Sequence, residues 1–174
     1  MSLPYESALG MSRRVLRALV VINVVYGVAI LGLILWSLFA EGLVMDALGV
    51  APAEDRVLML RGMQLVAFIG ILAVPLLHVI LQRLLSIVDT VRAGDPFITD
   101  NARRLRIIAQ TLFGIQLLHL LIGFVISRTR SQVQQLDLDW SFSLTPWIAV
   151  LLLFVLAGVF EHGARMRADL EGTV

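Results

Sequence analysis

Four long apolar segments dominate this chain of 174 residues, and arginine, acidic residues or turn formers border each of them. A helix rises about 1.5 Å per residue, so about 20 apolar residues cross the roughly 30 Å hydrocarbon layer of a membrane. Because lipid offers no hydrogen bonds to the backbone, such segments are expected to span as helices rather than as a closed barrel. The pattern predicts an all-α integral membrane protein with four transmembrane helices in one bundle.

The predicted spans leave no room for a separate soluble unit, so we expect a single transmembrane domain over residues 1–174. The spans fall at residues 18–40, 62–81, 105–127 and 146–164. The second helix should extend to Ala93, because its apolar stripe continues there while its other face becomes polar. Gly94 is expected to end that helix, and Thr99 or Asp100 to cap the next one.

The arginines predict how the chain crosses the membrane. All 14 basic residues are arginine, and basic residues that flank spans are retained on the cytoplasmic side. Ten of them fall on the side of both termini and of the connection between the second and third spans: Arg13, Arg14, Arg17, Arg83, Arg92, Arg103, Arg104, Arg106, Arg165 and Arg167. Arg56, Arg61, Arg128 and Arg130 fall on the other side, together with Trp36, Trp140 and Trp147. We therefore expect both termini in the cytoplasm.

Several polar side chains lie inside the predicted spans. Exposure of such groups to lipid is costly, so they are expected to face the bundle or a cavity. The candidate ligand-binding residues are Asn23, Tyr26, His78, Gln110, Gln116, His119 and His162. By helical rise, Asn23, His78, Gln110 and His162 lie within about two turns of the arginine-bearing boundary and would form one polar layer. Gln116 and His119 share a helix face nearer the middle of the membrane.

This polar layer has two interpretations. The side chains can simply join helices by hydrogen bonds, each contributing about 0.6 to 2 kcal/mol, and this interpretation is favoured. Alternatively, they form a small-ligand or proton-responsive site, since histidine titrates near neutral pH. Haem is a further alternative, because His78 and His162 match in depth whereas His78 and His119 differ by about 10 Å. We expect no resident cofactor and no metal site.

Motifs for catalysis are missing from the sequence. The chain has no cysteine, which excludes disulfides and thiol chemistry. Ser86, Ser127 and Ser143 lack a histidine and a carboxylate in any recognisable local arrangement, and no Gly-x-Ser-x-Gly turn is present. The glycines form no phosphate-binding loop. We therefore expect a non-enzymatic protein.

Two stretches on the arginine-rich side resemble the bacterial membrane family known as domain of unknown function 2975. The resemblance lies in the Gly-x-Pro-Phe turn at Gly94, Pro96 and Phe97 and in the Asn-Ala-Arg-Arg-Leu run at 101–105. It continues in Phe160, Gly163, Ala164 and Arg165 and in Thr173-Val174 at the end of the chain. The resemblance implies a multi-pass protein of the bacterial cytoplasmic (inner) membrane with no established reaction.

Members of that family are often encoded beside a small helix-turn-helix transcription regulator. The resemblance thus implies a membrane sensor or regulatory anchor that binds such a regulator without contacting nucleic acid itself. The residues expected to bind this partner are Phe97, Arg103, Arg104, Arg106, Arg165, Arg167 and Val174. The other expected contacts are with the lipid bilayer and with a second copy of the chain, because Gly27, Gly114, Gly123 and Gly158 would allow close helix packing. The alternative function is a ligand- or haem-binding protein that uses the histidine layer.

Overall fold

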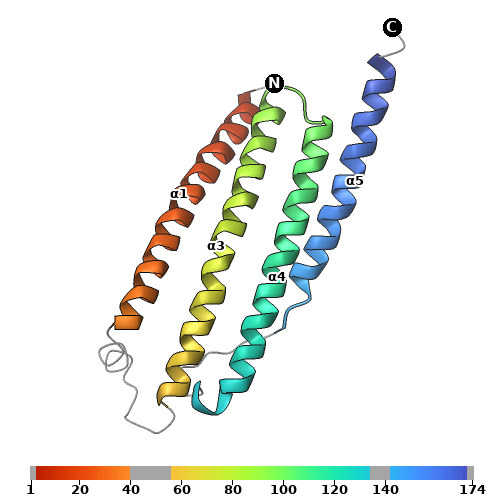
Figure 1. Ribbon diagram of the computed structural model, residues 1–174. Coiled ribbons are helices and arrows are strands. Elements are labelled where there is room, and N and C mark those ends of the chain that lie inside the picture. Colours follow the sequence, from red (N-terminus) through yellow and green to blue (C-terminus); the bar gives the residue numbers. More distant parts are fainter. Residues whose placement is uncertain (1–2, 40–55, 134–141, 172–174) are drawn as a thin grey trace.

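The computed structural model describes residues 3–39, 56–133 and 142–171. These residues form four helices, which are α1 (Leu3–Phe39), α3 (Arg56–Arg92), α4 (Thr99–Val133) and α5 (Thr145–Glu171) (Figure 1). All four are long and apolar enough to cross a membrane. The prediction of an all-α bundle of four transmembrane helices is confirmed, and the chain is a multi-pass membrane protein.

The helix ends follow local signals in the sequence. As predicted, α3 extends past its apolar span, to Arg92, and Gly94 follows with a left-handed φ of +88°. The main-chain N–H of Gly94 donates to the carbonyl of Val91, and that of Asp95 donates to Thr90, both at 3.1 Å. This pair of bonds is a Schellman motif, which satisfies carbonyls at the helix end and needs a residue that tolerates positive φ.

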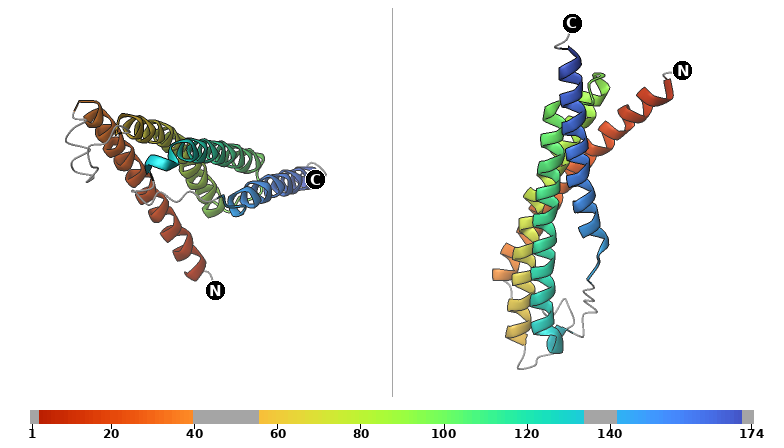
Figure 2. Two further views of the ribbon diagram at one scale, coloured as in Figure 1. Left: turned by 90° about the horizontal axis from the view of Figure 1, so that it is seen from below. Right: turned by 90° about the vertical axis from the view of Figure 1, so that its right-hand side faces the viewer.

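The helices pack in chain order rather than around a closed centre. α1 packs on α3, α3 packs on α4, and α4 packs on α5 (Figures 1 and 2). The N-terminal end of α1 diverges from the other three helices in both views of Figure 2. The two ends of the chain and the α3–α4 turn lie at the same end of the molecule in Figure 1. We call this the arginine-rich end.

The interior contacts are made by a small set of side chains, while most apolar side chains face outward. The buried apolar residues are Ile34, Ile69, Ile80, Leu81, Ala102, Leu105, Ile108, Ala109, Val150, Ala157 and Ala164. In α5, Val150, Ala157 and Ala164 recur every seven residues and form one seam, as in a coiled coil. The many exposed leucine, isoleucine and valine side chains would be unfavourable in water but match the hydrocarbon of a bilayer.

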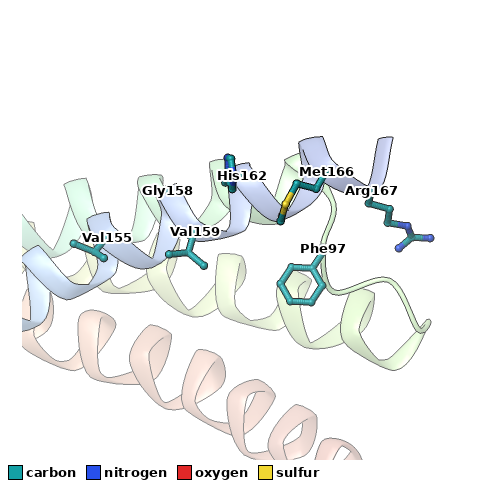
Figure 3. Close-up of a pocket in the computed structure, with 8 residues that line it drawn as sticks. Phe97, Val155, Gly158, Val159, His162, Met166 and Arg167 are labelled. Carbon is teal, nitrogen blue, oxygen red and sulfur yellow. The ribbon is translucent and has the colours of Figure 1, made fainter. Parts of the chain in front are cut away.

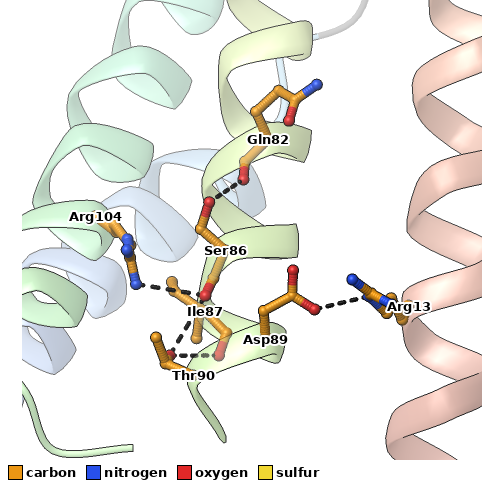
Figure 4. A network of polar contacts seen from close by, with 7 residues as sticks. All are labelled: Arg13, Gln82, Ser86, Ile87, Asp89, Thr90 and Arg104. Carbon is orange, nitrogen blue, oxygen red and sulfur yellow. Dashed lines mark hydrogen bonds and ion pairs between the residues drawn. The ribbon is translucent and has the colours of Figure 1, made fainter. Parts of the chain in front are cut away.

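Helix α1 is joined to α3 along a narrow line. The side chain of Asn23 is buried, and its Nδ2 donates to the main-chain carbonyl of Val74 at 3.1 Å. One turn further on, Gly27 packs directly on the Val74 side chain, so closely that a Cβ at position 27 would lie 2.7 Å from Cγ1. At the arginine-rich end, Arg13 Nε and Asp89 Oδ1 form an ion pair at 2.7 Å (Figure 4). The position of α1 therefore depends mainly on one close helix contact, one amide and one ion pair.

Substitution of Gly27 by leucine should separate α1 from α3. The new side chain would collide with Val74, and overpacking of this kind costs about 1–3 kcal/mol. We expect a lower midpoint of SDS-induced unfolding in mixed micelles. Gly32→Leu is the matched control, because Gly32 lies on the same helix with open space around it. Equal losses in the two variants would contradict the close α1–α3 contact.

Candidate functional site

The side chain of Asn101 organises the α3–α4 turn at the arginine-rich end. It is 0% exposed, and its Nδ2 donates to the Thr90 hydroxyl at 2.8 Å and to the Pro96 carbonyl at 2.9 Å. Its Oδ1 accepts a hydrogen bond from Arg104 Nη1 at 2.7 Å. Buried amides are stable only when such bonds are made. This single amide therefore joins the last turn of α3, the connecting turn and the first turn of α4.

Arg104 and Thr90 extend this network onto α3. Arg104 Nη1 also reaches the main-chain oxygen of Ser86 at 3.4 Å, and the hydroxyl of Thr90 donates to the carbonyl of Ile87 at 2.8 Å (Figure 4). Arg104 was predicted from the sequence to bind a partner, but in the structure its guanidinium points toward the preceding helix. Its bonds hold the hairpin together.

The rest of the Asn-Ala-Arg-Arg-Leu run divides between packing and exposure. Ala102 and Leu105 are buried in the helix contacts, as Asn101 is. Arg103 points outward, with 73% of its side chain exposed, and lies 3.7 Å from the carboxylate of Asp100. Most of this motif therefore builds the hairpin, and Arg103 is the member that presents its charge to the surroundings.

Phe97 links the α3–α4 turn to α5. Its ring centroid lies 5.2 Å from that of Phe160, with a tilt of 36° between the rings. Gly163 leaves room for this ring, since a Cβ there would lie 3.2 Å from Phe97 Cδ1. Phe97 nevertheless remains 45% exposed. The aromatic ring is thus fixed on one side and accessible on the other.

Ion pairs connect α5 to the same region. Glu161 accepts hydrogen bonds from Arg106 of α4 at 2.7 Å and from Arg165 at 2.6 Å. Arg167 Nη1 lies 2.8 Å from the carboxylate of Asp95 in the turn. Each exposed pair contributes little alone, so these contacts mainly set the relative position of α4, α5 and the turn. Val174, the last residue predicted to bind a partner, lies outside the described residues.

The predicted ligand-binding residues are distributed over all four helices. Asn23 joins α1 to α3, and His78 Nε2 on α3 lies 3.5 Å from Gln82 Nε2 of the same helix. Gln116 is half-buried, whereas the exposed members of the set are Tyr26, Gln110, His119 and His162. His78 and His162, which were expected to match in depth, stand on α3 and α5, and each of these helices packs on α4.

No metal site accompanies these side chains. In residues 3–39, 56–133 and 142–171, no group of three or more histidine, aspartate or glutamate side chains is arranged to hold a metal ion.

An open groove of about 690 Å³ runs along α5 beside Phe97 (Figure 3). Its α5 wall includes Val155, Gly158, Val159 and His162, and Arg167 lies at its far end. We call it the α5 groove. Sequence analysis singled out Phe97, His162 and Arg167 but did not find the groove. The spacing of three and four residues from 155 to 167, with a glycine at 158, is the signal that marks this helix face.

The family described as protein of unknown function DUF2975 matches residues 46–174. The chain belongs to this family. The resemblance found in the sequence is thereby confirmed, and the DUF2975 match covers α3, α4 and α5 with the Asn101 network, Phe97 and the α5 groove. No curated protein and no solved structure matches this DUF2975 chain.

Substitution of Asn101 by alanine should destabilise the hairpin. It would leave the Pro96 carbonyl and Arg104 without their buried partner, and such losses cost about 1–3 kcal/mol. We expect a lower midpoint of thermal unfolding in detergent, measured by circular dichroism. Asp100→Ala is the control at the neighbouring exposed position and should change stability by only about 0.5 kcal/mol. A similar midpoint for both variants would refute the central role of Asn101.

Proposed function

We propose that this DUF2975 protein is a non-enzymatic anchor or sensor in the bacterial cytoplasmic membrane that binds a small helix-turn-helix transcription regulator. Its arginine-rich end would face the cytoplasm with both termini. The excess of arginines on that side supports this orientation, because flanking basic residues are retained in the cytoplasm.

The observation that carries the proposal is the exposed aromatic ring of Phe97 among exposed arginines. Arg103 and Arg165 expose 73% and 72% of their side chains near this turn, although each has an acidic neighbour. Aromatic residues and arginine are enriched in protein interfaces. We call Phe97, Arg103 and Arg165 the docking surface. Its positive charge favours an acidic face of a soluble partner.

The contacts beneath the docking surface suggest how a signal would reach it. The turn is fixed to α3 and α4 by Asn101, whereas Phe97 and Asp95 connect it to α5. A shift of α5 against α4 would therefore move Phe97. A stimulus changes regulator binding only if it favours one of the two positions. In the favoured position the regulator would be held at the membrane, away from its operator.

Photocrosslinking in cells tests this partner. p-Benzoylphenylalanine at position 97 or 103 should crosslink the full chain to a small helix-turn-helix protein, identified by mass spectrometry. The same amino acid at Phe39 is the control, because that residue is exposed on α1 at the opposite end of the helix from Arg13. Crosslinks to the regulator from position 39 as strong as those from 97 and 103, or none from 97 and 103, would refute the proposal.

Reversal of the charge at Arg103 should weaken the complex. With the regulator and the full chain both purified, Arg103→Glu is expected to lower affinity about tenfold, because it places a carboxylate opposite an acidic face. Arg61→Glu makes the same change at an exposed position of α3 on the other side of the membrane and should leave affinity unchanged. Biolayer interferometry in detergent measures both. An unchanged affinity for Arg103→Glu would show that this surface is not the docking site.

A further inference from the structure

His162 occupies an unusual position for a histidine in a membrane-crossing helix. Polar side chains in such helices normally face the bundle interior. Helix α5 packs on α4 through Val150, Ala157 and Ala164, and helical spacing puts His162 on the other side of α5. Its side chain is exposed, and within the described parts of the chain it makes no hydrogen bond or ion pair. The protein therefore leaves an imidazole in the α5 groove without a partner.

The α5 groove has one apolar part and one basic part. Toward the middle of α5 its wall consists of Val155, Val159 and the bare backbone of Gly158, near which a Cβ would meet nothing within 4 Å. Toward the arginine-rich end it contains His162 and Arg167, which are separated by about 7.5 Å along the helix axis. Figure 3 shows the two valines and Phe97 on the same side of the helix.

The charges around the basic part leave a positive excess. Arg106, Arg165 and Arg167 face only two carboxylates, those of Glu161 and Asp95. A guanidinium group has five N–H donors, so Arg167 can bind a phosphate while its Nη1 pairs with Asp95. An imidazole adds a further donor.

We propose that the α5 groove binds one anionic phospholipid. Its phosphate lies between His162 and Arg167, and one acyl chain runs along Gly158 and Val155 toward the middle of the membrane. The groove lies on a helix apolar enough to cross the bilayer, so lipid is the solvent at its apolar part, and the positive excess selects an anionic headgroup. This site is a property of the chain alone and does not depend on the regulator.

Native mass spectrometry of the full chain in detergent tests the site. The protein is offered equal amounts of phosphatidylglycerol and phosphatidylcholine with identical acyl chains. We expect one phosphatidylglycerol to be retained in preference to phosphatidylcholine. His162→Leu and Arg167→Gln should each reduce this retention about fivefold, because each removes a donor to the phosphate. Gly158→Leu should reduce it as well, by filling the apolar part without changing any charge.

Two control variants separate the site from other effects of charge. Asp95→Asn breaks the same ion pair as Arg167→Gln but keeps the arginine, so retention should persist or rise. Arg92→Gln removes an exposed arginine of α3 that does not line the groove, and retention should be unchanged. Far-UV circular dichroism of each variant confirms that the helices are intact.

Three outcomes would overturn the proposal. Equal retention of the two lipids by the unaltered chain would show that only unspecific lipid is bound. A loss in Asp95→Asn or Arg92→Gln as large as that in Arg167→Gln would assign the effect to the turn or to general attraction. A dimer that retains no lipid and is lost in Gly158→Leu would show that a second copy of α5 occupies the groove.

Discussion

The buried amide of Asn101 is the interaction on which the rest of the arginine-rich end depends. It bonds at once to α3, to the turn and to α4, so these three parts have one relative position. That position sets where Phe97 and Asp95 meet α5. The docking surface and the α5 groove share Phe97, and both are consequences of how this amide fixes the turn.

Away from this end, the structure relies on close contact more than on a large core. Helix association in lipid has no hydrophobic driving force, so it depends on packing of small groups and on hydrogen bonds between helices. Gly27 against Val74, the Ala157 and Ala164 seam of α5, and the Asn23 amide bond are of these kinds. Their placement explains why a chain with few buried side chains still has a defined helix order.

The sequence predicted the helices well because their number and ends have local causes. Apolar runs identify the spans, and Gly94 ends α3 through a backbone conformation that glycine adopts readily. The favoured interpretation of Asn23 as a hydrogen bond between helices agrees with its bond to Val74. The facing of His162 and the internal role of Arg104 could not be read, because lipid and helix contacts are equally apolar, so hydropathy does not reveal which side of a helix meets its neighbour.

The row of helices has two flanks, and α1 forms one of them. Since α1 contacts α3 but not the seam between α4 and α5 in any extensive way, it can swing or slide in the bilayer while that seam stays intact. The rearrangement would exchange the Arg13–Asp89 pair and the Gly27 contact for lipid. Asp89 lies one residue before Thr90, a partner of the Asn101 amide, so a displacement of this outer helix would be felt directly at the hairpin.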